Sequence, residues 1–114
     1  MSSYSSDTYN AFLQELKTIE RSLQSDLKEL KINAGTNVNT FNTENSIRKN
    51  LESYSSKINK VQEEYTKKAK DIKYTIPERE YNRRMNEIND LRINYDRIKS
   101  EYDGLVDMKY KYVK

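Results

Sequence analysis

The chain has 114 residues and a net charge of +3, a length that suits one hydrophobic core and is too short for two. It contains no Cys and no His, which excludes disulfides, thiolate sites and imidazole-based catalysis or metal binding. Only two Gly and one Pro are present, so folds built from strands and tight turns lack their usual turn residues, and helices are expected.

The first predicted helix covers residues 7–32. Its apolar residues recur every three or four positions, and this spacing keeps them on one face of a helix. They are Phe12, Leu13, Leu16, Ile19, Leu23, Leu27 and Leu30. Ser6 or Asp7 is suited to cap the first amides, and Gly35 suits a left-handed residue after the helix end. The Asn- and Thr-rich stretch 36–43 is expected to be a connector.

The second predicted helix covers residues 43–74 and has the most regular apolar spacing in the chain. Its stripe consists of Ile47, Leu51, Tyr54, Ile58, Val61, Tyr65, Ala69 and Ile72. Pro77 favours an extended residue before it and suits the first turn of the next helix, and Thr75 with Glu78 matches a capping box. We therefore expect one helix to end and another to begin near residue 76.

The third predicted helix covers residues 76–111. Its apolar stripe consists of Tyr81, Met85, Ile88, Leu91, Tyr95, Ile98, Tyr102, Leu105, Met108 and Tyr112. Tyrosine is frequent in the stripes of the second and third helices, and a tyrosine ring packs in a core while its hydroxyl reaches the wet edge. We expect this arrangement for Tyr54, Tyr65, Tyr81, Tyr95 and Tyr102.

Three amphipathic helices joined by short connections are typical of a bundle in which sequence neighbours run antiparallel. Each helix has one narrow apolar stripe, which favours packing of the coiled-coil type. We predict an all-α fold, an antiparallel up-down-up three-helix bundle that forms a single domain over residues 1–114 and is monomeric.

Paired carboxylates are the feature that most invites a catalytic interpretation. Glu63 and Glu64, and likewise Glu78 and Glu80, are one or two positions apart. Residues at these spacings do not share a face of a helix, and a catalytic pair also needs an apolar pocket that separates the two pKa values. The sequence has no Gly-rich phosphate loop, metalloprotease helix motif or calcium loop. We therefore predict that the protein is not an enzyme and binds no cofactor or metal.

Basic residues are concentrated where the second helix gives way to the third. Residues 67–84 carry 7 Lys and Arg against 3 Asp and Glu, whereas residues 1–66 carry 8 against 9 and residues 85–114 carry 6 against 6. The candidate partner-binding site, which we call the basic corner, consists of Lys67, Lys68, Lys70, Lys73, Arg79, Arg83 and Arg84.

Two interpretations of the basic corner are open. It is a solvated surface if its lysines mainly complement the helix dipole and pair with Glu63 and Glu64 four residues earlier. Alternatively, it is a cationic surface that meets an acidic protein or makes a weak contact with anionic lipid headgroups. Nucleic acid is the less favoured partner, because the rest of the chain is nearly neutral and offers few phosphate contacts.

Several runs of the second and third helices also match a known pattern. The runs are Lys49-Asn50-Leu51-Glu52-Ser53, Lys57-Ile58-Asn59-Lys60-Val61, Tyr81-Asn82-Arg83-Arg84-Met85-Asn86 and Ile98-Lys99-Ser100, together with Ile72, the Pro77 turn and Leu105. In this order they resemble the amino-terminal, Habc-like domain of Qb-type SNARE proteins, and the Vti-like and novel plant SNARE-like proteins are the nearest in pattern. The resemblance is specific over residues 47–105.

The resemblance implies a regulatory domain that precedes a SNARE helix and a membrane anchor and acts in vesicle trafficking and membrane fusion. The partners it implies are trafficking adaptors, SNARE-regulatory proteins and the protein's own SNARE helix. The location it implies is the cytoplasmic face of endomembranes of the Golgi, endosome or vacuole type. The alternatives are a structural coiled-coil segment and, less favoured, a basic RNA-binding helical module.

Overall fold

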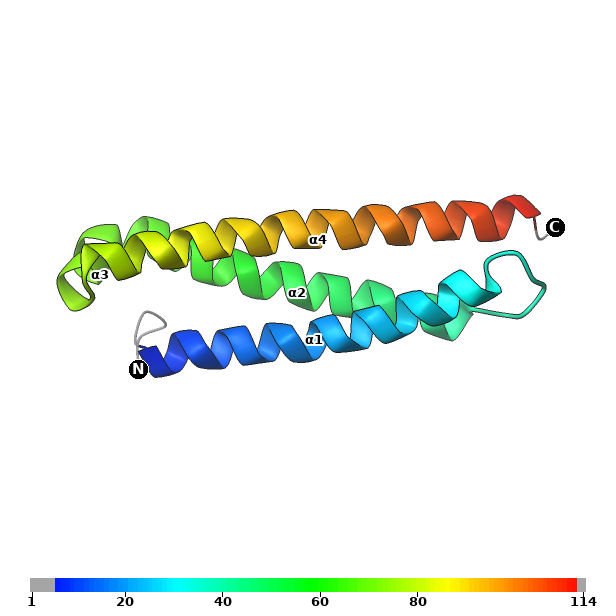
Figure 1. Ribbon diagram of the computed structural model, residues 1–114, viewed down its shortest axis with the longest axis horizontal. Coiled ribbons are helices and arrows are strands. Elements are labelled where there is room, and N and C mark those ends of the chain that lie inside the picture. The colour runs from blue at the N-terminus through cyan, green and yellow to red at the C-terminus, as the bar shows by residue number, and fades with distance from the viewer. Residues whose placement is uncertain (1–5, 113–114) are drawn as a thin grey trace.

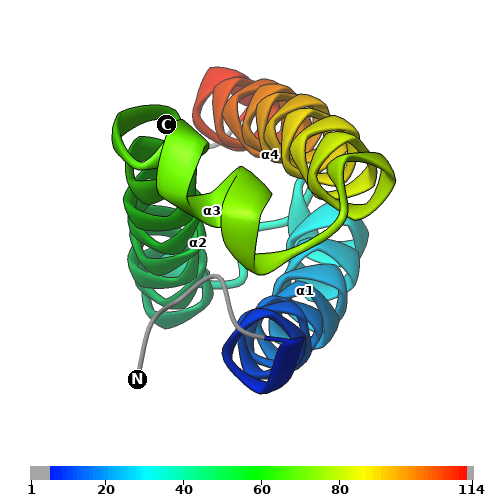
Figure 2. The ribbon, with the colours of Figure 1, turned by 90° about the vertical axis from the view of Figure 1, so that its left-hand side faces the viewer.

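In the part of the chain that the structure describes, three long helices pack side by side along a common axis and one short helix lies across one end (Figures 1 and 2). The computed structural model describes the backbone of residues 6–112 and the side chains of residues 7–72 and 75–111. Its helices are α1 (Ser6–Asn33), α2 (Phe41–Lys67), α3 (Ala69–Thr75) and α4 (Glu78–Tyr112). The described residues contain no strand, so the predicted all-α class is confirmed. The molecule measures 58 × 19 × 18 Å.

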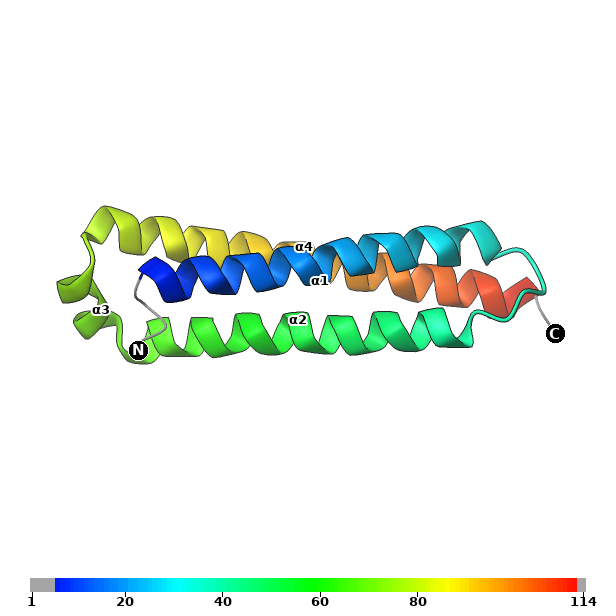
Figure 3. The same ribbon diagram turned by 90° about the horizontal axis from the view of Figure 1, so that it is seen from below.

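The two ends of this elongated molecule are built from different segments. The connection between α1 and α2 lies at one end together with the last turns of α4 (Figures 1 and 3). The first turns of α1 lie near the other end, where α3 and the start of α4 are found. Helix α2 packs extensively against both α1 and α4, whereas α1 and α4 share a smaller contact.

The core runs the length of the molecule, and most of its residues belong to the predicted apolar stripes. Met108 is an exception, because it is exposed and Lys109 is buried beside it. The side chain of Tyr112 lies outside the described residues. One cluster of buried side chains surrounds Tyr9, Tyr65 and Ile88, and a second surrounds Leu23, Ile47 and Ile98. Two half-buried residues, Ile19 and Tyr95, pack against both clusters and join them. The three-and-four spacing therefore identified the packed faces of α1 and α2 and most of that of α4, where Arg84 and Lys109 are buried although the stripe passed through Met85 and Met108.

Four of the five tyrosines predicted in the core are buried, and Tyr95 is half-buried. The hydroxyls of the four buried tyrosines have partners within the protein. Tyr54 donates to Glu20 at 2.6 Å, Tyr81 donates to the carbonyl oxygen of Tyr65 at 3.3 Å, and Tyr102 accepts from Arg48 at 3.0 Å. The rings fill the core, as expected, and the hydroxyls link neighbouring helices.

The prediction of one continuous helix over 43–74 is wrong. The chain turns at Lys68, where φ is −111° and ψ is 27°, and α3 then lies across the end of the bundle (Figure 2). The turn places Ile72 and Ile76 in the cluster that contains Tyr9 and Tyr65. A straight continuation of α2 would carry these two apolar side chains beyond the start of α1, so burial of apolar surface favours the turn.

The predicted left-handed glycine after α1 is also wrong, because Gly35 does not have a positive φ. The helix ends in a tight turn instead. The amide of Thr36 donates to the carbonyl oxygen of Asn33 at 3.1 Å, and its hydroxyl donates to the same oxygen at 2.9 Å. The side chain of Thr36 therefore satisfies a helix-end carbonyl without glycine.

The predicted capping box at the start of α4 is not formed. The hydroxyl of Thr75 donates to the carbonyl oxygen of Asp71 at 2.9 Å, within α3. Ile76 is extended, as expected for a residue before proline, with φ −127° and ψ 153°. The carbonyl oxygen of Pro77 accepts from the amide of Tyr81 at 3.0 Å, so Pro77 itself begins the helical hydrogen bonding. None of the described helices has the length and apolar character of a membrane span.

Candidate functional site

The basic corner lies where α2, α3 and α4 meet, and the structure divides its residues into three groups. Lys67, Lys68, Lys70, Arg79 and Arg83 are exposed, as a binding surface requires. Arg84 is buried. The side chain of Lys73 lies outside the described residues, so its predicted role is untested.

Arg84 is a correction to the predicted site, because only 2% of it is exposed. Its guanidinium donates from Nη1 to the hydroxyl of Tyr65 at 3.0 Å and from Nε to Glu80 at 3.1 Å, and it lies 4.6 Å above the centre of the Tyr9 ring. A guanidinium held by two hydrogen bonds and an aromatic face is part of the core. It is therefore not accessible to a partner.

Two exposed residues of the basic corner have carboxylate partners close by. Lys67 pairs with Glu63 at 2.6 Å. Arg83 forms an ion pair with Glu80, and its Nη1 is 3.8 Å from Glu87. Hydrogen bonds from Arg83 and then Arg84 lower the pKa of the Glu80 carboxyl to about 2. The local carboxylates therefore reduce the positive field that the sequence count suggested.

A second surface, which the sequence did not indicate, is a groove between α2 and α4. Its volume is about 720 Å³, whereas a hollow between α1 and α2 has a volume of about 240 Å³. We call it the α2–α4 groove. Its lining consists of Arg48, Leu51, Glu52, Ser55, Ser56, Asn59, Lys60 and Glu63 from α2 and of Tyr95, Lys99, Tyr102 and Asp103 from α4.

The floor of the α2–α4 groove is apolar and its sides are polar. Leu51 and Tyr102 are buried at the floor, and Tyr95 is half-buried beside them. Ser55 and Ser56 add two small side chains. The charged lining residues are three cations, Arg48, Lys60 and Lys99, and three anions, Glu52, Glu63 and Asp103. The groove is therefore balanced in charge.

Several of the polar residues that line the α2–α4 groove are paired with one another. Lys99 pairs with Asp103 at 2.9 Å across one helical turn, and the hydroxyl of Tyr102 accepts from Arg48 at 3.0 Å. These contacts are of the kind that solvated helix faces form. Over the described residues, no group of three or more acidic side chains is arranged to hold a metal ion.

No protein-family model, curated protein or solved structure matches this chain. The class that the fold itself defines is that of all-helical proteins with three long helices packed together. The resemblance to SNARE proteins therefore rests on the sequence runs quoted for it in the second and third predicted helices.

Proposed function

We propose that this chain is a helical protein-interaction domain whose α2–α4 groove binds an amphipathic helix of another segment or protein. The observation that carries the proposal is the shape of the groove. Its lining on α2 runs from Arg48 to Glu63 in alternating steps of three residues and one residue. At about 1.5 Å per residue this is a strip of roughly 22 Å along the helix axis, which suits about four turns of a bound helix.

In this proposal, the three long helices form an antiparallel up-down-up bundle. Two sets of contacts support this topology. Tyr9 near the start of α1 contacts Tyr65 near the end of α2, and Arg84 near the start of α4 lies over Tyr9. At the other end, Lys109 near the end of α4 bonds to the carbonyl oxygen of Asn33 at the end of α1. In such a bundle a fourth helix laid in the α2–α4 groove completes a four-helix arrangement.

The chemistry of the groove suits a helix with one apolar stripe and mixed charges on its flanks. The stripe would cover Leu51 and Tyr95, and the small side chains of Ser55 and Ser56 would let the backbone of the bound helix approach closely. The balanced charges would pair with either sign on the flanks. Nucleic acid and anionic lipid are poorer occupants of this groove, because both require an excess of cations.

The SNARE resemblance supplies a specific form of this function. In that form the chain is the regulatory amino-terminal domain of a SNARE acting in vesicle trafficking and membrane fusion, without enzymatic activity. Its partners would be trafficking adaptors, SNARE regulators or its own SNARE helix, at the cytoplasmic face of endomembranes. In support, the runs that carry the resemblance supply several groove residues, among them Leu51, Asn59, Lys60 and Lys99.

The SNARE form of the proposal is tested by the sequence that the natural transcript encodes after residue 114. We expect a heptad segment with a central Gln, followed by a long apolar stretch. A transcript that encodes neither would contradict the assignment to a SNARE. A structural coiled-coil segment is the second candidate, but the apolar stripes already pack against one another within a single chain.

The groove is tested with a synthetic peptide of that heptad segment, titrated into the isotope-labelled domain and followed by NMR. We expect amide shifts at Leu51, Ser55 and Tyr95. Replacing Ser55 and Ser56 together with Arg should block the groove and weaken binding by about tenfold or more. The control is Ser25→Arg, on an exposed position of α1. Equal affinity in the two variants would remove the groove as the binding site.

A further inference from the structure

Exposed apolar side chains gather at one end of the molecule. Six large hydrophobic residues are exposed among the side chains that the structure describes, and five of them belong to the end formed by the α1–α2 connection and the last turns of α4. These five, which we call the apolar tip, are Ile32, Val38, Phe41, Met108 and Tyr110. The sixth, Ile93, lies in the middle of α4. Scattered single apolar residues are ordinary on a surface, but this concentration is not.

The connection that carries the apolar tip is held in one conformation by hydrogen bonds. The ammonium group of Lys109, which is 3% exposed, donates to the carbonyl oxygens of Asn33 at 3.1 Å, Thr36 at 2.6 Å and Val38 at 2.5 Å. The hydroxyl of Thr36 accepts from the amide of Val38 at 3.2 Å. Val38 is thus presented outward, 53% exposed, on an ordered backbone. An ordered loop loses little conformational freedom when its side chains are buried in an interface.

The start of α2 is ordered in the same way. The amide of Phe41 donates to the side-chain oxygen of Asn39 at 2.9 Å. Thr40 donates to the buried carboxylate of Glu44 at 2.7 Å, and the hydroxyl of Tyr110 donates to the same carboxylate at 3.0 Å. Phe41, 59% exposed, therefore projects from a fixed helix end.

The exposed charges around the apolar tip are mostly positive. The helical segments at this end are the last nine residues of α1 and of α4 and the first nine of α2. The exposed cations are Lys28, Lys31, Arg48, Lys49 and Lys111, and the exposed anions are Glu29 and Asp107. The two remaining carboxylates of these segments, Asp26 and Glu44, are half-buried or buried and accept hydrogen bonds from Ser46 and Thr40.

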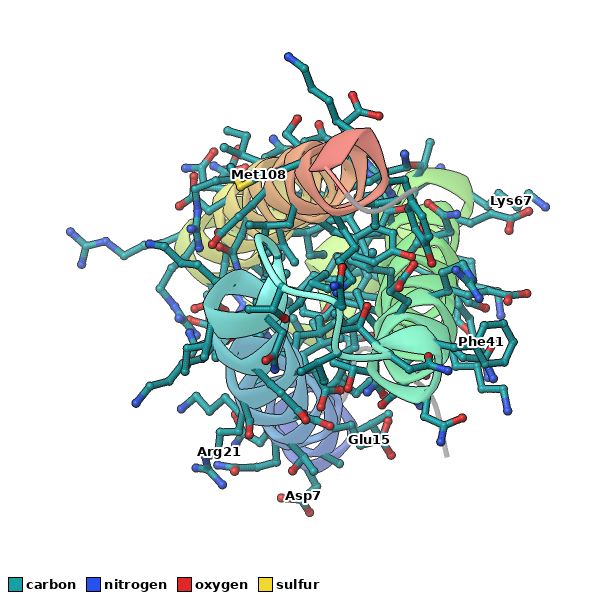
Figure 4. The ribbon with its side chains drawn as sticks, turned by 90° about the vertical axis from the view of Figure 1, so that its right-hand side faces the viewer. Asp7, Glu15, Arg21, Phe41, Lys67 and Met108 are labelled. Carbon is teal, nitrogen blue, oxygen red and sulfur yellow. The ribbon has the colours of Figure 1, made fainter. Side chains whose placement is uncertain are left out.

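We propose that the apolar tip inserts into an anionic lipid surface. The excess of exposed cations complements negative headgroups, and the side chains of Val38 and Phe41 can enter the boundary between headgroups and acyl chains. The shape of this end supports a lipid occupant over a protein one. Phe41 and Met108 lie on different sides of the end (Figure 4), so the apolar side chains surround the end and do not form one flat face. A fluid interface can receive side chains spread around an end in this way, whereas a protein partner would have to surround that end.

This contact is distinct from the lipid contact that is one of the two interpretations of the basic corner, which lies at the other end of the bundle. It is also independent of the proposed helix-binding function, because none of the five residues of the apolar tip lines the α2–α4 groove, although Arg48 lies between the two surfaces. The variant with Ser55 and Ser56 replaced by Arg should therefore bind vesicles at least as well as the unaltered chain.

The first experiment places a single fluorescent reporter at the tip, which is straightforward because the chain has no Trp. Phe41→Trp and the control Ile93→Trp are mixed with vesicles of phosphatidylcholine containing about one third phosphatidylserine. We expect the emission of the Phe41→Trp protein to shift to shorter wavelength and that of the Ile93→Trp protein to stay unchanged. No shift at position 41, or an equal shift at both positions, would overturn the proposal.

The second experiment measures co-sedimentation with the same vesicles. Replacing Val38 and Phe41 together with Asp should lower the bound fraction by about tenfold or more, while Ile93→Asp should not lower it. All three positions are exposed, so circular dichroism should show the helical fold retained. The proposal fails if the double variant binds as the unaltered chain does, or if binding is lost instead on replacing Lys67 and Arg79 with Glu.

Discussion

The guanidinium of Arg84 in α4 donates a 3.0 Å hydrogen bond to the hydroxyl of Tyr65 in α2, inside the bundle. The same group lies 4.6 Å above the ring of Tyr9 in α1. One side chain therefore joins all three long helices. It also fixes their relative position at the end where α3 lies across the bundle, because a hydrogen bond and a cation–π contact depend on geometry more than apolar packing does.

Removing this side chain should destabilise the fold. For Arg84→Ala we expect the free energy of unfolding to fall by about 2–3 kcal/mol, since a buried phenol loses a charged partner and a cavity is left. Urea denaturation followed by circular dichroism measures it. Arg79→Ala is the control, because Arg79 is exposed in the same helix. Similar losses in the two variants would mean that Arg84 is a surface residue.

The turn at Lys68 should be maintained by the apolar side chains of α3. Ile72 is fully buried, so Ile72→Ala should cost about 2–4 kcal/mol, as truncation of a core isoleucine does. Lys70→Ala, on the exposed side of the same short helix, should cost far less. The same denaturation measurement compares them, and a small effect of Ile72→Ala would show that α3 is not packed on the core.

The last turns of α4 should hold the connection between α1 and α2. Lys109→Met keeps the length of the side chain but removes the donor to three carbonyl oxygens, and we expect a loss of about 2–3 kcal/mol. Amide hydrogen exchange at residues 34–40 should accelerate most, because local opening becomes easier there. Lys31→Met, at an exposed position, should change neither quantity. Unchanged exchange in Lys109→Met would contradict the role of this lysine.

The stability of the protein should fall in acid partly through Glu80. Hydrogen bonds from Arg83 and Arg84 depress the pKa of this carboxyl to about 2, below the value of about 4.3 in an unfolded chain. Its contribution is therefore present above about pH 4.3 and is lost as the pH falls toward 2. Glu80→Gln should be less stable than the unaltered chain at pH 7, and the difference should shrink toward pH 2. A difference independent of pH would contradict this, and Glu101→Gln is the control.

The helical stripes were predictable because apolar spacing reports directly which face of a helix is packed. The burial of Arg84 was missed because the predicted stripe passed through the apolar residue next to it, Met85. Steps of three and four residues also connect Tyr81, Arg84 and Ile88, and this spacing places the arginine on the buried face. The turn at Lys68 was missed because Ala69 and Ile72 continue the stripe of α2 and no Gly or Pro interrupts it.

The α2–α4 groove was not predictable from the chain alone. Its serines and charged residues have the sequence signature of a solvated face, and they form a groove only through the way α2 and α4 pack against each other. The apolar tip was partly visible, since Val38 and Phe41 are apolar residues within a polar connector. The conformation that exposes Val38 depends on Lys109, which is 71 residues away in sequence.

The central claim is that the three apolar stripes close on one another within one chain and leave the α2–α4 groove open for a different helix. Sedimentation equilibrium over a rising range of protein concentrations tests this most directly. We predict a constant mass of 13.6 kDa, that of the monomer. A mass that rises to twice this value would contradict the account, because a second copy would then occupy the surfaces assigned to recognition.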